Sequence, residues 1–458
     1  MLTGHAPGLY SQDADSLRIV TSISFSGNKV TRANILEREL MFAAGDTLTL
    51  TALREKVELT RENLINTSLF NFVVAKVEDT DGWHVSVNYE LTERWYIWPW
   101  PIIEFADRNI NTWWRDSRDL SRMSYGMLLK WENFRGRKEK LYLTARFGYN
   151  EKYGFDYTLP YLNRKETIGL GLGMSYGRSH EVPVNSIDNI LLYYKDVDNY
   201  VISLVNAYIS LIYRREIYNT HYFSLSFDYQ DYADTVLQLN PEFSVNQANP
   251  LEFLSLSYIF KSDHRDNKAY PLSGHYFDLE VVKHGLGLFS DGPDMFSVSS
   301  TFRKYFTLSK RFYFASGLNS RFTNNSAQPF LMSGTIGYGR DIVRGYEYFV
   351  IHGYNLGIFK NNLKFALVPV KDYDLGFIRS EKFSKVHYAF YLNAFLDVGY
   401  ADNPHPVPEN DNYLENDLLI GYGLGLDFVT YYDIVFRFEY SFNRLNESGF
   451  FIHFIAPI

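Results

Sequence analysis

One segment near the end of the chain constrains the fold more than any other. Over residues 434–443, aromatic and aliphatic side chains such as Phe438 alternate with polar or charged ones such as Glu439. Successive side chains of a β-strand point to opposite faces, so this pattern predicts a strand with one apolar and one polar face. Residues 223–230 repeat the alternation. A soluble sheet would bury the apolar face, but here that face is too continuous and recurs too often. We therefore predict a membrane barrel with lipid outside and water inside.

The composition and the length fit this prediction. Tyr and Phe supply 37 and 36 residues, and such an excess is typical of β-strands and of the aromatic girdles of membrane barrels. No run approaches the roughly 18 consecutive apolar residues of a membrane helix. About 360 residues follow position 94, and at roughly 20–25 residues per strand and connection they predict about sixteen antiparallel transmembrane strands.

Charge and cysteine content exclude several other functions. The net charge of −8 argues against nucleic acid as a partner, because phosphate binding needs a basic face. The chain has no cysteine, which excludes disulfides and thiolate metal sites. The histidines are scattered without metal-ligand spacing, and no catalytic constellation stands out. We expect no cofactor, no metal and no enzymatic activity.

The region before the barrel has a different spacing of apolar residues and contains the only convincing helical patterns. We predict a strand at 19–25, a helix capped by Thr31, a second helix from about Leu53 to Leu64, and two closing strands. The closing strands are expected at residues 72–77 and 84–89. The order β-α-α-β-β suits a small α+β domain in which two helices cover one sheet face. The run 98–101, Trp-Pro-Trp-Pro, is predicted to be a rigid connector, because proline cannot donate to a strand ladder.

This small domain resembles the POTRA (polypeptide-transport-associated) domain, with Gly27-Asn28 after its first strand and Ser68-Leu69-Phe70 leading into the second. Four stretches of the barrel resemble the Omp85 superfamily of outer-membrane assembly and translocation proteins, of the surface-antigen D15 type. They are Asn133-Phe134-Arg135-Gly136-Arg137, Asp263-His264-Arg265-Asp266-Asn267 with Tyr270-Pro271-Leu272-Ser273-Gly274, Val343-Arg344-Gly345-Tyr346, and Phe395-Leu396-Asp397-Val398-Gly399. The resemblance covers nearly the whole chain.

The residue patterns and the resemblance together predict three segments. Residues 1–17 lack the pattern of a secretory signal and are expected to be a disordered N-terminus. Residues 18–94 are expected to form one POTRA-like domain. Residues 95–458 are expected to form the barrel, with a loop around 330–350 folded into its lumen.

The resemblance also implies a contact inside the barrel, which we call the loop lock. Arg344 of the motif that begins at Val343 is expected to meet Asp397 on the inner wall, because an enclosed guanidinium is costly unless it is paired. Gly345 would let the loop backbone approach closely, and Tyr346 would pack beside it. The alternative is a solvated loop arginine and an unrelated strand aspartate.

Four further residues bear on the loop lock. Phe395 and Gly399 are expected to flank Asp397 on the same strand face. Lys364 lies where the family often carries an acidic residue, and we expect it to add positive charge near Arg344. Glu347 is then a further acid that would help to hold the loop.

The implied function is insertion and assembly of β-barrel proteins in the bacterial outer membrane, or translocation of polypeptide, without nucleotide hydrolysis. The POTRA-like domain would lie in the periplasm. Expected partners are unfolded outer-membrane or exported polypeptides, accessory proteins of the periplasm or outer membrane, and the lipid bilayer. The seam between first and last strands is the family's functional edge, where an unpaired strand recruits incoming strands.

Two alternatives remain open. One is a two-partner-type secretion pore for a dedicated exported protein. That branch usually carries two POTRA domains and an N-terminal plug helix, and we find neither pattern in the sequence. The other is a passive barrel that only anchors a periplasmic adaptor. A single POTRA domain favours an auxiliary family member.

Overall fold

The structure is a computed structural model that describes residues 16–453 except 107–112, 115–117, 290, 325–327, 340, 431 and 433. Residues 1–15, which belong to the segment expected to be disordered, lie outside the described residues. The chain divides into two compact units. The first comprises residues up to 96 together with 132–139 and 375–385, and the second comprises the remainder.

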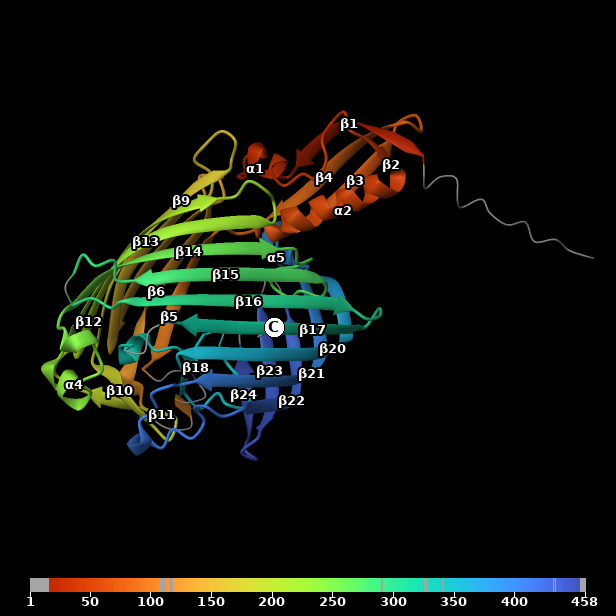
Figure 1. The fold of residues 1–458 in the computed structure, drawn as a ribbon. Coiled ribbons are helices and arrows are strands. Elements are labelled where there is room, and N and C mark those ends of the chain that lie inside the picture. The colour runs from red at the N-terminus through yellow and green to blue at the C-terminus, as the bar shows by residue number, and fades with distance from the viewer. Residues whose placement is uncertain are drawn as a thin grey trace, which may run out of the picture. The chain divides into compact units, whose positions relative to one another are not determined.

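The first unit contains the small α+β domain. Its elements are β1 (Leu17–Ser26), α1 (Ala33–Glu37), β2 (Thr47–Thr49), α2 (Leu50–Asn66), β3 (Phe70–Asp79) and β4 (His84–Glu93). The sheet has the order β2-β1-β4-β3, with β1 and β4 parallel (Figure 1). Helix α2 packs its buried stripe, which includes Leu53, Val57 and Leu64, onto this sheet. Both predicted helices and all three predicted strands are present, and β2 is an additional short strand.

The cap of the first helix differs from the prediction. Arg32 occupies the N-cap position of α1 and makes no side-chain capping hydrogen bond. The Thr31 hydroxyl is buried instead and lies 3.1 Å from the Tyr96 hydroxyl, so a tertiary contact takes the oxygen expected to cap the helix. In α2 the cap has the usual form, because the Thr49 side chain accepts from the Ala52 N–H at 3.2 Å.

The second unit is built on one antiparallel sheet of sixteen strands, as the sequence predicts. Among the described residues the sheet runs from β24 at one end to β5 at the other, and Figure 1 shows neighbouring strands such as β14 to β17 side by side. The strands of the sheet are β5 (Ile97–Phe105), β6 (Met123–Phe134), β7 (Glu139–Gly148), β8 (Asn150–Leu159), β9 (Ile168–Ser179), β12 (Ile202–Tyr213), β13 (Asn219–Tyr232), β14 (Leu251–Asp263), β15 (Gly274–His284), β16 (Met295–Thr307), β17 (Phe312–Thr323), β20 (Asn355–Asp374), β21 (Lys385–Asp402), β22 (Leu419–Val429), β23 (Val435–Asn443) and β24 (Ser448–His453).

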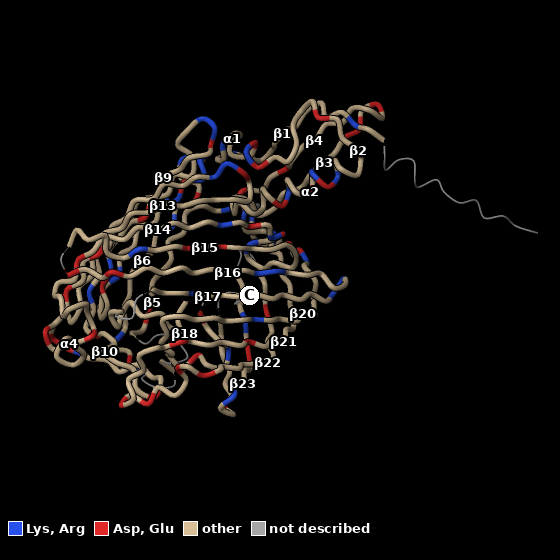
Figure 2. The backbone as a smooth tube through the Cα atoms, viewed as in Figure 1, with Lys and Arg blue, Asp and Glu red and all other residues tan. Residues whose placement is uncertain are grey.

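Shorter elements lie in the connections. They are the hairpin β10 (Glu181–Ile187) with β11 (Ile190–Lys195), the helices α4 (Asp234–Leu239) and α5 (Glu381–Ser384), and the two-residue strands β18 (Thr335–Ile336) and β19 (Ile351–His352). Among the described residues no helix is long and apolar enough to cross a membrane. In Figure 2 charged residues gather in the connections near α4 and β10, whereas the middle parts of the strands are largely tan.

The faces of the sheet are inverted relative to a soluble protein. Along β23, Arg437 and Glu439 are fully buried, whereas Phe438 is 37 % and Tyr440 is 49 % exposed. Strand β21 follows the same rule, with Asp397 buried and Leu396 46 % exposed. Polar side chains inside and apolar side chains outside are the arrangement of a membrane barrel. The alternation read from the sequence is confirmed.

The prediction of a connector at residues 98–101 is wrong, because this run lies within β5. The Tyr96 carbonyl accepts from the Glu132 N–H at 2.7 Å, and the Ala106 N–H donates to the Arg122 carbonyl at 3.1 Å. Hydrogen-bonded pairs recur at every second residue of an antiparallel ladder, so even-numbered residues of β5 bond to β6. Pro99 and Pro101 are odd-numbered. Their missing N–H groups would have pointed away from β6, and no ladder bond is lost.

The inverted faces lead to a first prediction. Leu396→Arg should lower barrel stability by about 2–4 kcal/mol, the cost of a cationic side chain facing lipid near the bilayer midplane. Leu17→Arg in the α+β domain is the matched control, because Leu17 is 47 % exposed, and it should change stability by less than about 0.5 kcal/mol. Folding in lipid vesicles across a urea series, followed by gel migration of unheated samples, measures both. Equal effects of the two variants would contradict a lipid-facing Leu396.

Candidate functional site

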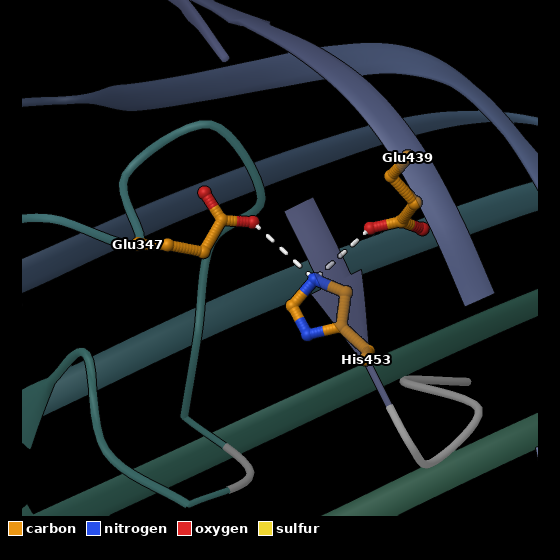
Figure 3. Close-up of side chains that lie close together, drawn as sticks. All are labelled: Glu347, Glu439 and His453. Atoms are coloured by element: carbon orange, nitrogen blue, oxygen red, sulfur yellow. Dashed lines mark ion pairs between the residues drawn. The ribbon is translucent and has the colours of Figure 1, made fainter. Parts of the chain in front are cut away.

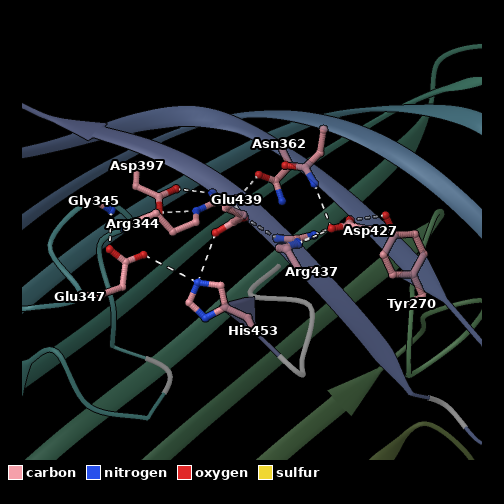
Figure 4. Close-up of polar contacts among 11 residues, drawn as sticks. Tyr270, Arg344, Gly345, Glu347, Asn362, Asp397, Asp427, Arg437, Glu439 and His453 are labelled. Carbon is pink, nitrogen blue, oxygen red and sulfur yellow. Dashed lines mark hydrogen bonds and ion pairs between the residues drawn. The ribbon is translucent and has the colours of Figure 1, made fainter. Parts of the chain in front are cut away.

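The loop between β18 and β19 carries Arg344, whose guanidinium is completely buried. Its Nε donates to Asp397 Oδ2 at 2.7 Å and its Nη2 to Asp397 Oδ1 at 2.5 Å, a bidentate pair (Figure 4). Its Nη1 donates to Asn362 Oδ1 on β20 at 2.8 Å. The planar guanidinium also lies over the Phe395 ring, 4.0 Å from its centroid. Two neighbouring strands, β20 and β21, therefore hold one loop side chain.

Glycines allow the loop backbone to come this close. Gly345 has a φ of +92°, and a Cβ there would lie 2.7 Å from the Phe442 carbonyl oxygen on β23. On β22, a Cβ at Gly421 would lie 1.6 Å from the Arg344 carbonyl oxygen. Neither position accepts a larger residue without moving the loop. The backbone of the loop is thus seated on two strands, and the Asn443 side-chain N–H donates to the Gly345 carbonyl at 2.9 Å.

Val343 and Tyr346 anchor the loop on either side of Arg344. Both are buried in one apolar cluster with Ile336, Leu419 and other residues. The Tyr346 hydroxyl accepts from the Ile420 N–H at 3.4 Å. A Cβ at Gly399 would approach Val343 Cγ2 to 2.4 Å, so Gly399 makes room for Val343. The loop is therefore held by apolar packing as well as by charge.

A second arginine extends the network along the inner wall (Figure 4). Arg437 on β23 is fully buried and pairs with Asp427 on β22, Nη2 to Oδ2 at 2.7 Å. The Tyr270 hydroxyl donates to the same oxygen at 2.6 Å. One oxygen of Glu439, Oε1, lies 3.5 Å from Arg344 Nη1 and 3.4 Å from Arg437 Nη1, so this carboxylate bridges the two arginines.

Lys364 and Glu347, both expected to influence the loop lock, also have contacts with other residues. Lys364 is buried on β20, but its Nζ lies over the Tyr270 ring at 4.3 Å, next to the Arg437 end of the network. Glu347 accepts from the Gly345 N–H at 2.8 Å and lies 3.7 Å from His453. Glu439 is a second acid that approaches Arg344, with its Oε1 at 3.5 Å from Arg344 Nη1.

Sequence reasoning missed Asn362, Asp427, Arg437 and Glu439 as members of the site. The alternation of residues 434–443 already places Arg437 and Glu439 on the inner face. A second signal is the run Gly421-Tyr422-Gly423-Leu424-Gly425-Leu426-Asp427, in which glycines occupy one face of β22. A Cβ at Gly423 would lie 2.7 Å from the Phe395 ring, so these glycines leave the space that the network fills.

The sixteen-stranded sheet, the α+β domain before it and the arginine loop buried on the inner wall together define the class of POTRA-bearing β-barrels. The family model of the Omp85 superfamily domain matches residues 133–445. The POTRA model, described as a surface antigen variable number repeat, matches residues 19–94. The chain belongs to the Omp85 superfamily and carries a POTRA domain.

Solved structures show the same fold at low identity. BamA from Haemophilus ducreyi lacking POTRA domains 1–3 has a TM-score of 0.51 at 17 % identity, covering 95 % of this chain and 83 % of that chain. CdiB from Escherichia coli has a TM-score of 0.54 at 12 % identity, covering 96 % of this chain and 75 % of that chain. No curated protein matches the sequence.

The buried pair leads to a second prediction. Arg344→Met should destabilise the barrel by about 3–5 kcal/mol, because Asp397 would remain buried without its counter-charge. The control is Arg444→Met, which removes an Arg–Asp pair whose side chains are 42 % and 40 % exposed, and it should cost at most about 1 kcal/mol. Urea unfolding of the full chain in detergent measures both. Comparable losses of stability in the two variants would show that burial of the Arg344–Asp397 pair does not increase its contribution to stability.

Proposed function

We propose that this chain is a bacterial outer-membrane protein that assists insertion and assembly of β-barrel proteins, without nucleotide hydrolysis. In this proposal residues 18–94 form the periplasmic POTRA domain and residues 95–458 the barrel. Its substrates are unfolded outer-membrane polypeptides. The proposal rests on the construction of the two end strands of the sheet, on the edge strand of the POTRA domain, and on the buried loop.

The observation that carries the proposal is the construction of the two end strands. In β24, even-numbered residues point their backbone groups away from β23, because the Asn443 N–H donates to the Glu447 carbonyl at 3.0 Å and odd-numbered residues continue this ladder. In β5 the odd-numbered residues point away from β6. Pro99 and Pro101 therefore place two carbonyls on this edge without the matching N–H groups.

The prolines have two energetic consequences for a seam in lipid. Each unsatisfied backbone group costs several kcal/mol in the hydrocarbon core, so an edge with two fewer N–H groups is less costly to leave open. A closed seam would also gain two fewer hydrogen bonds, each worth about 0.5–1.5 kcal/mol. Both effects favour exchange of the seam partner for an incoming strand.

The POTRA sheet offers a second edge for an extended polypeptide. The ten-residue strand β3 stands at one end of the sheet order β2-β1-β4-β3. Val74 is 50 % and Val77 is 44 % exposed on it. Strand addition uses backbone hydrogen bonds for affinity and tolerates many side chains, which suits a binder of diverse unfolded substrates.

The loop lock gives the inner wall a fixed arrangement. Arg344 binds side chains of β20 and β21, and its loop backbone is seated against β22 and β23. Of these strands, β23 lies next to β24. In our proposal the lock keeps these strands in register while the edge beyond them exchanges partners. Val343, Tyr346, Phe395 and Gly399 serve this role through packing.

A secretion pore for a dedicated exported protein is the second candidate. The fold of CdiB matches as well as that of BamA, with TM-scores of 0.54 and 0.51. Depletion of the protein followed by quantitative proteomics of outer membrane and medium separates the candidates. Assembly activity predicts loss of many barrel proteins from the outer membrane. Loss of one exported protein alone would favour the secretion pore, and an unchanged proteome would favour a passive anchor.

The proline edge leads to a third prediction. Replacing both prolines, Pro99→Val with Pro101→Val, should restore two N–H donors and strengthen seam closure, so the folded barrel should resist higher temperature while its assembly activity falls. Pro404→Val, in an exposed loop, is the control and should change neither property. Gel migration after graded heating and barrel insertion into vesicles give the two readouts. Higher assembly activity of the double variant would contradict the proposed role of the two prolines at the seam.

A further inference from the structure

Three side chains from distant parts of the chain meet on the inner wall beside the loop lock (Figure 3). They are Glu347 of the β18–β19 loop, Glu439 of β23 and His453 at the end of β24. His453 Nε2 lies 3.3 Å from Glu439 Oε2 and 3.7 Å from Glu347 Oε1. One ligand atom from each residue lies within 4.8 Å of the others.

Each carboxylate presents a single oxygen to this point. Glu347 Oε2 accepts from the Gly345 N–H at 2.8 Å, which turns Oε1 towards His453. Glu439 Oε1 faces Arg344 and Arg437, which turns Oε2 towards His453. The partners of Glu347 Oε2 and Glu439 Oε1 thus fix the orientation of the other carboxylate oxygens, just as hydrogen bonds to metal ligands orient those ligands.

The atoms that face the common point are buried polar atoms. Glu439 is completely buried and Glu347 is 5 % exposed. Among the described residues, neither Glu439 Oε2 nor His453 Nε2 has a hydrogen bond of acceptable geometry, although they lie 3.3 Å apart. A buried carboxylate oxygen without a well-formed hydrogen bond is energetically costly, and a bound cation would offset this cost. Donors bound at about 2.0–2.2 Å in a tetrahedron lie roughly 3.3–3.6 Å from one another. The two separations from His453 Nε2, 3.3 and 3.7 Å, are close to this range.

We propose that Glu347, Glu439 and His453 form a binding site for one divalent transition metal of the zinc class, with water as a fourth ligand. Two monodentate carboxylates and one imidazole suit zinc, whereas calcium and magnesium prefer sites made of oxygen donors alone. The two carboxylates supply two negative charges for the cation. The side chain of His453 is 18 % exposed, which leaves an approach from the lumen.

A bound metal would connect the buried loop to the end strand of the sheet. Glu347 belongs to the loop of Arg344, and His453 belongs to β24. Metal coordination would therefore tie β24 to the loop lock and restrain the strand that borders the seam. The alternative occupant of this point is a proton, with His453 as an imidazolium between two carboxylates.

The test uses the full chain, folded in detergent and stripped of metal by a chelator. Calorimetry with Zn²⁺ should show one ion per chain. At a zinc concentration about 100 times the dissociation constant, the unfolding equilibrium constant should fall about 100-fold. Loss of a residue that merely hydrogen-bonds to a metal ligand weakens metal binding by about 10–100-fold. Loss of a ligand itself, in His453→Gln or Glu347→Gln, should therefore weaken zinc binding by at least about 100-fold.

Two matched controls and one further variant keep the result interpretable. His405→Gln and Glu409→Gln, at exposed positions in the 402–417 connection, should bind zinc like the unaltered chain. The chain contains no cysteine, so His453→Cys with Co²⁺ should add a thiolate charge-transfer band only if position 453 is a ligand. The metal site would be overturned by any of three results: no zinc binding to the unaltered chain, equal binding by His453→Gln, or no charge-transfer band in His453→Cys. In each case an imidazolium at His453 between the two carboxylates would be the remaining explanation.

Discussion

The burial of the Arg344 guanidinium sets the requirements for one side of the barrel. A buried cation loses its hydration, and the loss is offset only if carboxylates and hydrogen-bond acceptors surround it in good geometry. Asp397 supplies both oxygens, and Asn362 supplies a third acceptor. These two residues stand on different strands, so their positions depend on the strand register. The lock thus links the conformation of a loop to the register of the wall.

The same requirement explains why the network is larger than one ion pair. Glu439 lies near both Arg344 and Arg437, and Arg437 in turn neutralises Asp427. Removing any member leaves a neighbour with an uncompensated charge in a site that water does not reach. Replacing such a network by apolar residues can be neutral for stability. The network instead favours a single strand register, because a one-residue slip of a strand would turn the charged side chains of that strand to the lipid face.

Local patterns predicted the fold well, and tertiary geometry explains where they failed. The inverted faces of β23 follow from alternation alone, and the sixteen strands follow from length. The three-residue strand β2 is too short for any period to reveal. Thr31 has an oxygen of the right type for a helix cap, but whether this hydroxyl caps the helix or meets Tyr96 depends on residues far away in the sequence. Proline alone argues against a strand at Pro99 and Pro101, because local sequence does not reveal on which side of β5 the neighbouring β6 lies.

The candidate site was predictable only in part, for a related reason. A family motif brought Arg344 and Asp397 together, and the structure places them in bidentate contact. Glu347 is close to Arg344 in sequence, yet the positive φ of Gly345 turns the loop so that its carboxylate meets His453. Residues that are adjacent in a loop can face different strands, whereas residues two apart in a strand share a face. Sequence proximity was therefore a poor guide in the loop and a good one in β23.

Glu439 joins the loop lock to the end of the sheet. Its Oε1 lies between the two arginines, and its Oε2 faces His453 on β24. A displacement of β24 therefore removes one of the groups facing this carboxylate, and the arginines must then balance a larger share of its charge. In a barrel whose end strands exchange partners, movement at the seam would reach Arg344 through Glu439 and its loop through Glu347. The lock and the seam are then parts of a single charge network, whether His453 holds a proton or a metal.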